Sequence, residues 1–461
     1  MTEEFEDKKT NMTKHTDVTK MDERNLNYRL DLLLRTGCLL MENAADASRI
    51  MRTMRRGAVY LGLPREDLHI YIVYNMLMVN LSDSERSFTK FQRVEKHGVN
   101  LDVIRGVSHL SWEALRRNYT LEEFDSELEA VKKRKRNYIP WDTAIGGGMA
   151  CGGFCVQFGG DWMAFVYASI AAVIGLRLRM LLNERGSNMY VNTAVAAFVS
   201  TIVAWLFGML SMQVPTLSSA TPWHPLMACA LFIVPGVPLI NFVSDFLSGF
   251  TQVGTTRAVS TLLIMLSMAF GIAFAIQVCG IDNFVRDLSM IPHHSFYSYI
   301  IAAAVSAVGF SMIFNVPRSL MVFIAIGGII AVCTRNIVSL GPSNGNWGLD
   351  LGPIVGSFAG SALVSIVCCI LIRRLHTPHQ CISIPAVIPM IPGVLMYRAL
   401  FALINMQGVV GEVTIAVSNG IHAMLIIFCI ALGVAIPNIF FRRMITPKNE
   451  QKLMDMLSER K

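Results

Sequence analysis

Long apolar stretches dominate the chain after residue 140, and they limit what it can fold into. A run of about 20 apolar residues can cross the hydrocarbon core of a bilayer as a helix, which satisfies its own backbone polar groups. The sequence therefore predicts a mostly α-helical, polytopic membrane protein with about ten transmembrane helices. We expect these spans near residues 142–159, 162–182, 190–211, 225–246, 258–280, 296–315, 319–334, 352–372, 382–404 and 419–440.

Charged residues are concentrated at the N-terminal end. Residues 1–140 hold 24 of the 40 lysines and arginines and 22 of the 33 acidic residues, and no lysine occurs between Lys135 and Lys448. A polar domain therefore precedes the membrane region. We expect a disordered tail (1–27), a cytosolic domain (28–138), a first membrane half (139–282), a second membrane half (283–445) and a cytosolic tail (446–461).

The polar region reads as a small α+β domain. Apolar residues at spacings of three and four between Leu30 and Gly62 indicate one or two amphipathic helices. The runs HIYIVYNMLMVNLSD and RSFTKFQRV alternate apolar and polar residues around a Ser-Asp-Ser turn, which favours a hairpin. Thr120 and Glu123 have the spacing of a helix capping box.

Basic residues in the loops indicate the orientation. With the KKRKR run (132–136) in the cytoplasm, the loops on that side collect nine arginines, whereas the opposite loops hold only Arg286 and Arg335. This bias follows the positive-inside rule. The N-terminus is charged and lacks the apolar core of a signal peptide. We therefore expect both termini in the cytoplasm.

The two membrane halves resemble each other. Phe154 matches Phe310 and Arg179 matches Arg335, in both cases with an offset of 156 residues. Further on, VPGVPLIN at Val234 matches IPGVLMYR at Ile391, with an offset of 157. If each half has five spans, the second half is inverted in the membrane. We expect two five-helix inverted repeats, which are typical of secondary transporters.

Proline and glycine interrupt a corresponding span in each half. Proline lacks an N–H and its ring clashes with the preceding turn, so Pro235, Pro238 and Pro392 free backbone groups at bilayer depth. Such groups are tolerated only where they line protein or water. A packed kink without a ligand is the simpler interpretation of one such break. Matched breaks in both halves favour a substrate site near the middle of the membrane.

Three polar residues accompany these breaks. Ionisable groups inside spans are costly and usually face a pathway, which singles out Asp245 and Arg398. Asn241 shares a helix face with Asp245, four residues on. Asp245 lies roughly 15 Å to the cytosolic side of its break and Arg398 roughly 9 Å to the exterior side, so we do not expect them to pair. The alternatives are an interfacial cap for Asp245 and a snorkelling side chain for Arg398.

Other conspicuous residues have simpler explanations. The ten cysteines show no Cys-x-x-Cys pairing, so we interpret them as packing residues. The histidines have no metal-ligand spacing, and the glycine clusters at 145–154, 326–330 and 356–360 let helices approach closely. The net charge of +7 is explained by topology rather than by nucleic-acid binding. We expect no metal, no cofactor and no nucleic-acid partner.

Five segments in this order resemble the threonine/serine exporter family. They are LLLRTGCLLMENAADASRIMRTMRRGAVYLGL, HIYIVYNMLMVNL, NLDVIRGVSHL, VPGVPLINFVSDFLSG with Arg257 downstream, and IPGVLMYRAL, and the resemblance runs from about residue 28 to 440. It implies an inner-membrane exporter of small hydrophilic metabolites, driven by the proton-motive force, and not an enzyme. Its partners would be a small-molecule substrate, protons and the lipid bilayer, with a homo-oligomer left open.

The resemblance also implies roles for individual residues. Substrate binding would fall to Pro235, Gly236, Asn241, Pro392, Gly393, Tyr397 and Arg398, and proton coupling to Asp245. Asp245 is the carboxylate that we place well inside the broken first-half region, where it could gain and lose a proton during transport.

The substrate and two other classes of function stay open at this stage. Two-chain relatives are associated with export of C4-dicarboxylates such as succinate, so a dicarboxylate is the alternative to an amino acid. A dicarboxylate would use Arg398 and helix N-termini and leave Asp245 to carry the proton. A membrane-embedded hydrolase would need Asp245 and Asp350 within hydrogen-bond reach. A regulatory domain at 28–138, anchored by the spans, is the third possibility, and we favour neither of these two.

Overall fold

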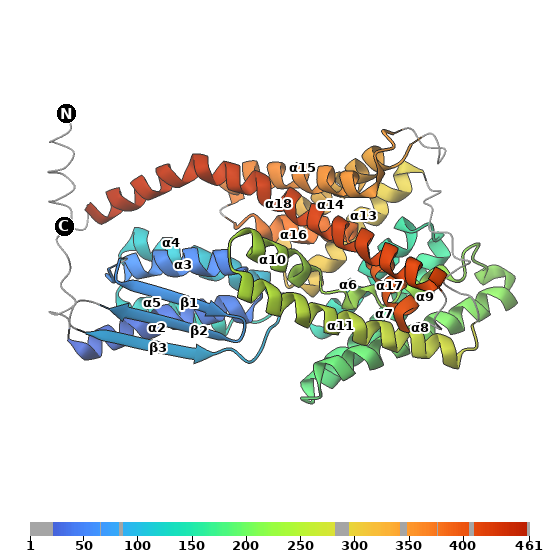
Figure 1. Ribbon diagram of the computed structural model, residues 1–461, viewed down its shortest axis with the longest axis horizontal. Helices are drawn as coiled ribbons and strands as arrows, with labels where there is room; N and C mark the ends of the chain where they lie inside the picture. Colours follow the sequence, from blue (N-terminus) through green and yellow to red (C-terminus); the bar gives the residue numbers. More distant parts are fainter. Residues whose placement is uncertain are drawn as a thin grey trace. The chain divides into compact units, whose positions relative to one another are not determined.

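The computed structural model describes residues 22–64, 66–82, 86–281, 295–341, 348–375, 377–404 and 410–458 (Figure 1). Side chains are described for these residues except 372–375, 397, 401, 403–404, 410–412 and 442–458. The described chain is mostly helical, with one three-stranded sheet near the N-terminus. It divides into a first unit, Met1–Gly98 with Val103–Arg134 and Met456–Lys461, and a second unit, Val99–Asp102 with Lys135–Asp455.

The first unit packs helices against an antiparallel sheet. Its elements are α2 (Glu23–Glu42), α3 (Ala47–Tyr60), β1 (Leu68–Val73), β2 (Met76–Ser82), β3 (Ser87–Arg93), α4 (Leu101–Arg117) and α5 (Leu121–Lys132). The strands pair in the order β1-β2-β3, and β2 buries every second residue, Leu77, Val79 and Leu81, on the side where α2 packs. The predicted small sheet is confirmed.

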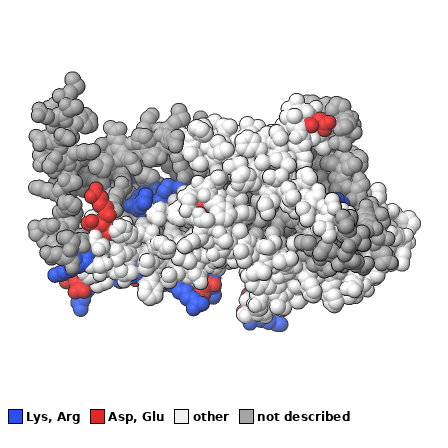
Figure 2. All heavy atoms as spheres, viewed as in Figure 1, with Lys and Arg blue, Asp and Glu red and all other residues white. Residues whose placement is uncertain are grey.

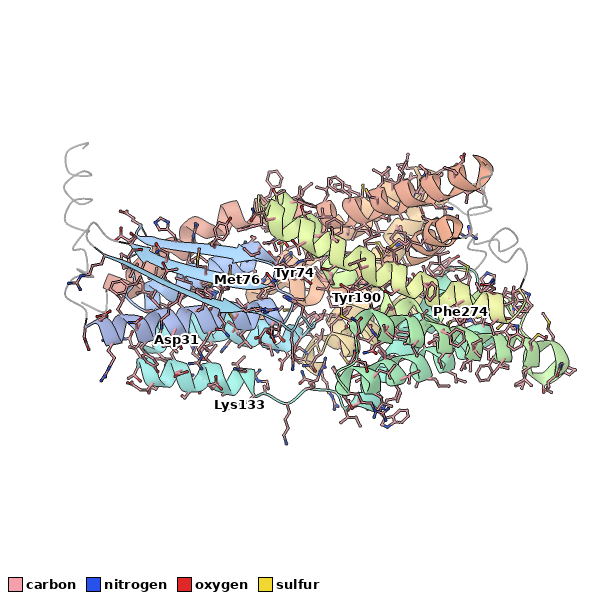
Figure 3. The ribbon with its side chains drawn as sticks, turned by 60° about the horizontal axis from the view of Figure 1, so that its bottom comes forward. Asp31, Tyr74, Met76, Lys133, Tyr190 and Phe274 are labelled. Atoms are coloured by element: carbon pink, nitrogen blue, oxygen red, sulfur yellow. The ribbon has the colours of Figure 1, made fainter. Side chains whose placement is uncertain are left out.

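The first strand of the predicted hairpin is itself a hairpin of two strands. The run HIYIVYNMLMVNLSD forms both β1 and β2, with Val73 opposite Met76 across a turn at Tyr74 and Asn75 (Figure 3). A single polar residue, Asn75, marks this turn between two apolar runs, and the sequence prediction read across it. Strands β2 and β3 pair as predicted, and their connection, 83–85, lies outside the described residues. The predicted capping box is present, because the Glu123 N–H donates to Thr120 Oγ1 at 3.2 Å and the Thr120 N–H donates to Glu123 Oε2 at 2.7 Å.

The second unit is helical throughout its described residues. Its α-helices are α6 (Pro140–Gln157), α7 (Trp162–Glu184), α8 (Met189–Gln213), α9 (His224–Ala228), α10 (Gly236–Leu247), α11 (Thr251–Val278), α13 (Phe296–Ile313), α14 (Met321–Ser339), α15 (Gly352–Leu375), α16 (Gln380–Val387), α17 (Gly393–Ile404) and α18 (Val410–Ser458). Short 3-10 segments are η2 (Pro215–Leu217), η3 (Leu231–Ile233), η4 (Arg318–Leu320) and η6 (Ile388–Met390). Large apolar side chains such as Phe270, Ile370 and Met424 are exposed, as contact with lipid requires. On the face drawn in Figure 2, uncharged residues cover most of the described surface of this unit.

The helices agree closely with the predicted spans. Within the described residues, seven helices are long and apolar enough to cross a membrane, and nine spans result if each of two bent helix pairs counts as one. The remaining predicted span, 142–159, is the first along the chain and forms α6, which is less apolar because five of its 18 residues are glycines. Helix α18 runs beyond the predicted span to Ser458, since the sequence there is rich in good helix formers.

Helices α6 and α13 lie against each other in antiparallel directions. A Cβ added at Gly146 would lie 2.7 Å from Met312 Cβ, and one added at Gly153 would lie 2.6 Å from the Ala302 carbonyl oxygen. Between these points the Ser306 hydroxyl donates to the Ala150 carbonyl at 3.3 Å. Ser306 and Ala150 are 156 positions apart, so residues that match between the two halves meet at this crossing.

Candidate functional site

The first broken span is interrupted at Pro235. The segment His224–Ile233 and helix α10 are bent by 59° relative to each other. Pro235 has φ −79° and ψ 68°, and the Gly236 N–H donates to the Val234 carbonyl at 2.8 Å. These values describe an inverse γ-turn, in which three residues are closed by one hydrogen bond. The proline thus ends one half-helix, and α10 begins directly after it.

The second broken span repeats this geometry. The segment Gln380–Met390 and the part of α17 from Gly393 to Leu400 are bent by 60°. The Gly393 N–H donates to the Ile391 carbonyl at 2.8 Å, so Pro392 occupies the centre of the same kind of turn. The prediction of matched breaks is confirmed in its local geometry.

The two breaks contact each other reciprocally. A Cβ on Gly236 would lie 2.9 Å from Ile391 Cδ1 and 3.0 Å from Ile388 Cδ1. A Cβ on Gly393 would lie 2.7 Å from Leu231 Cδ2 and 3.6 Å from Val234 Cγ2. Each glycine therefore leaves room for the side chains that precede the other break. All three pairs, Gly236 with Gly393, Leu231 with Ile388 and Val234 with Ile391, are 157 positions apart.

A small cavity of about 10 Å³ lies where the breaks meet. Both halves contribute to its lining, and all the lining side chains are apolar: Phe154, Leu231, Val234, Phe310, Ile388 and Ile391, together with Gly393. A space of this size holds about one water molecule. In this conformation the region between the breaks is closed.

Two half-helices begin at the breaks. Helix α10 starts at Gly236 and α17 at Gly393, so the positive ends of both helix dipoles lie there. The first N–H groups to find an acceptor one turn back are those of Leu239, which donates to Pro235 at 2.9 Å, and Met396, which donates to Pro392 at 3.1 Å. Ahead of them, the Gly236 and Gly393 N–H groups already donate within the turns and Pro238 has no N–H. The N–H groups of Val237 in α10 and of Val394 and Leu395 in α17 therefore have no acceptor within their own helix.

Asp245 forms a buried ion pair with Arg257. The Arg257 Nε lies 3.3 Å from Asp245 Oδ2, and the two side chains are 6% and 0% exposed. The pairing results from the tight connection between α10 and α11, where Gly249 adopts φ 82° and the Phe250 N–H donates to the Asp245 carbonyl at 2.9 Å. Gly254 then packs against α10, with an added Cβ 3.0 Å from the Phe246 ring. The sequence places Arg257 in a cytoplasmic loop and gives it no part in the site, whereas in the structure it lies buried in α11, as the one charged residue of that helix.

The remaining predicted site residues lie on the half-helices that follow the breaks. Asn241 is buried on α10, one turn before Asp245. Arg398 lies half-buried on α17, one turn after the second break. Tyr397 belongs to α17, but its side chain lies outside the described residues. Sequence reasoning also missed Phe154, Phe310, Leu231 and Ile388, whose role at the cavity depends on helix contacts that spacing does not reveal.

Clusters that could hold a metal ion are absent from the part of the chain that the structure describes. Asp350, the second carboxylate considered for a hydrolase, lies before α15 with φ 54° and beside Gly341. Asp245 has its ion pair with Arg257 on α11. The described site therefore combines two helix breaks, two helix N-termini and one buried ion pair.

Two family models match the chain, one in each half. The threonine/serine exporter model, ThrE, matches residues 31–279, and a second model described as "Threonine/Serine exporter, ThrE" matches residues 299–440. The chain is similar to "Threonine/serine exporter" of Corynebacterium glutamicum, with 24% identity over 69% of this chain and 63% of that protein. It is also similar to "Probable threonine/serine exporter" of Mycobacterium tuberculosis, with 18% identity over 83% of this chain and 71% of that protein.

A further relative covers about half of the chain. It is "Probable succinate transporter subunit YjjP" of Escherichia coli, with 25% identity over 55% of this chain and 96% of that protein. No solved structure matches the chain.

Proposed function

The chain belongs to the threonine/serine exporter family, and we propose that it is a secondary active exporter of threonine/serine-type amino acids, driven by protons. It would reside in the inner membrane with both termini in the cytoplasm. The family is one of transporters, which fits the apolar helices of the second unit. The reciprocal contact between the two breaks carries the proposal, because secondary transporters bind their substrate where matched broken helices of two repeats meet.

We extend the proposal to ten spans in two five-helix inverted repeats. The bent pairs would each count as one span, and α6 would be the tenth. The antiparallel packing of α6 on α13, with Ala150 opposite Ser306, supports an inverted relation between the halves. Glycines in α6 are compatible with a span because they let α13 approach closely. In a membrane such close packing, rather than burial of apolar area, holds helices together.

Substrate recognition would use the breaks and the first turns of α10 and α17. The substrate carboxylate would bind at the helix N-termini at Gly236 and Gly393, with Pro235 and Pro392 holding the turns. Asn241, Tyr397 and Arg398 would contact the rest of the substrate. Asp245 would carry the proton, and Arg257 would balance the charge of the Asp245 carboxylate when the proton has left. Protonation of Asp245 would release Arg257 from the pair, which links a proton to a rearrangement of α10 and α11.

A dicarboxylate substrate is the second candidate, and the name of the Escherichia coli relative favours it. Two positive helix ends could bind the two carboxylates of one molecule. An amino acid instead needs a site for its ammonium group, which the Asn241 side chain and backbone carbonyls before each break could provide. A dicarboxylate would therefore occupy both helix ends, whereas an amino acid would occupy one helix end and the hydrogen-bond acceptors beside it.

Efflux from loaded vesicles separates the two candidates. Purified protein is placed in vesicles that contain labelled threonine and succinate with different isotopes, and efflux is followed with an acidic exterior. We expect threonine to leave faster than succinate, and faster than without the pH gradient. Vesicles containing the Gly420→Ala variant serve as a matched control, because that Cβ would lie 3.7 Å from its nearest neighbour, an ordinary contact. Faster efflux of succinate would favour the second candidate, and efflux of neither would contradict both.

A further inference from the structure

Four phenylalanine rings form a continuous row along α6 and α13. Phe154 stacks on Phe158 with ring centres 5.4 Å apart, and Phe310 stacks on Phe314 at 5.8 Å. Phe154 and Phe310 meet edge to face at 5.6 Å and 81°. All three separations fall in the range of favourable aromatic pairs. We call Phe158, Phe154, Phe310 and Phe314 the aromatic column.

The column is symmetric and joins opposite ends of the helix pair. Phe154 matches Phe310 and Phe158 matches Phe314, each 156 positions apart. Because α6 and α13 are antiparallel, Phe158 and Phe314 lie at opposite ends of the crossing. Next to Phe314, Asn315 Oδ1 accepts the Asn137 N–H at 2.8 Å, and Asn137 follows the basic run 132–136. The positive-inside rule assigns that end to the cytoplasm.

The centre of the column closes the cavity between the breaks. Phe154 and Phe310 are 3% and 1% exposed, and both line the cavity of about 10 Å³. A space that holds about one water molecule has no room for an amino acid or a dicarboxylate. A substrate can occupy the breaks only if residues that line the cavity move, and Phe154 and Phe310 are its largest lining side chains. Each ring belongs to a different half and keeps its own stacking partner on that half.

We propose that the aromatic column is a two-sided gate over the substrate path, with Phe154 and Phe158 closing the exterior side and Phe310 and Phe314 closing the cytoplasmic side. This rests on the proposed function and adds the residues that open and close the site. One stacked pair can swing away with its half while the other stays in place, which is what alternating access between two repeats requires. The edge-to-face contact of Phe154 with Phe310 forms when both sides are closed.

Access of a thiol reagent to the cavity tests the gate directly. The reporter is Leu231→Cys, which lines the cavity, in a full chain whose ten native cysteines are replaced. Cys151 is replaced by serine, since its sulfur accepts the Phe232 N–H at 3.2 Å. A membrane-impermeant reagent is added to intact cells, so that only opening to the exterior leads to labelling. Phe198→Ala is the control, because Phe198 pairs with Phe274 at 5.3 Å and neither ring lines the cavity.

Loss of the Phe158 ring should raise the labelling rate of the Leu231→Cys reporter, and loss of the Phe314 ring should not. We expect Phe158→Ala to raise the labelling rate by about tenfold, the change that loss of one aromatic contact gives a two-state equilibrium. Phe314→Ala should leave the rate at or below that of the reporter alone. Phe158→Leu keeps most of the volume and should give a smaller rise, and it decides the matter if the alanine variant does not fold.

Equal effects of Phe158→Ala and Phe314→Ala, or effects no larger than that of Phe198→Ala, would show that the rings only pack and would overturn the gate. A rise with Phe314→Ala alone would overturn the assignment of the two sides. Labelling needs no substrate. One-sided labelling in a protein that moves neither threonine nor succinate would therefore support the gate and contradict the proposed function separately.

Discussion

Neutralising either member of the Asp245–Arg257 pair should destabilise the protein. The side chains are 0% and 6% exposed, so the energies of buried pairs apply rather than those of surface pairs. Arg257→Gln leaves a buried carboxylate without its counter-charge and should cost about 3–5 kcal/mol. Asp245→Asn leaves the buried Arg257 guanidinium without its counter-charge and should cost a similar amount, about 3–5 kcal/mol. The double variant replaces the ion pair by two amides and should be more stable than Arg257→Gln alone.

Measurements of transport should show a separate effect of Asp245. Asp245→Asn removes the proposed proton carrier, so efflux driven by a pH gradient should be lost while exchange at equal pH is partly kept. Unfolding of the purified variants in detergent and efflux from vesicles measure the two effects separately. Arg318→Gln is the matched control: Arg318 Nη2 lies 3.9 Å from Asp142 Oδ2 with side chains 70% and 35% exposed, and such a pair contributes about 0–1 kcal/mol.

Either of two results would contradict these roles of Asp245 and Arg257. If Arg257→Gln destabilises the protein no more than Arg318→Gln does, the pair at 3.3 Å is not a buried structural interaction. If Asp245→Asn transports normally under a pH gradient, Asp245 does not carry the proton, and the first break has a role in packing or substrate binding only.

Three further outcomes can be checked independently. Gly153→Ala should destabilise the α6–α13 crossing by about 1–3 kcal/mol, because its methyl group would meet the Ala302 carbonyl oxygen at 2.6 Å, and unfolding equal to that of Gly420→Ala would contradict the crossing. In the first unit, Arg35 hydrogen-bonds Glu129 at 2.6 Å and holds the pKa of that carboxyl below its usual 4.5. Its contribution to stability is present above that pH and is lost as the pH falls through the lowered pKa. The protection of the α5 amides, corrected for their intrinsic exchange rate, should therefore fall in acid, and Arg35→Gln should weaken that pH dependence. A cysteine introduced at Lys135 should resist impermeant reagents added to intact cells, and labelling there would reverse the proposed orientation.

The sequence allowed the breaks to be predicted because proline acts locally. Pro235 and Pro392 interrupt a helix through their own rings, whatever surrounds them, and the offset of 157 can be counted in the sequence itself. The same holds for the capping box at Thr120, whose partners are three residues apart. These features depend on near neighbours in the chain.

The remaining features depend on which helices pack together. Arg257 reaches Asp245 only because the connection at Gly249 turns α11 back along α10. The edge-to-face contact of Phe154 with Phe310 requires the antiparallel crossing of α6 and α13, which glycines permit but do not specify. Long-range contacts of this kind carry no signal in the spacing of residues.

Stabilisation of the purified protein by ligand is the most direct test of the central claim that the substrate binds at the two breaks. Threonine at about 100 times its dissociation constant should stabilise the protein by about 2.7 kcal/mol. The variants Gly236→Ala and Gly393→Ala place a methyl group 2.9 Å from Ile391 Cδ1 and 2.7 Å from Leu231 Cδ2, flexible ends that can move, so both should fold and should lose most of this stabilisation. Gly420→Ala should keep it. If threonine and succinate stabilise all three variants as much as the unmodified protein, the breaks are not the substrate site.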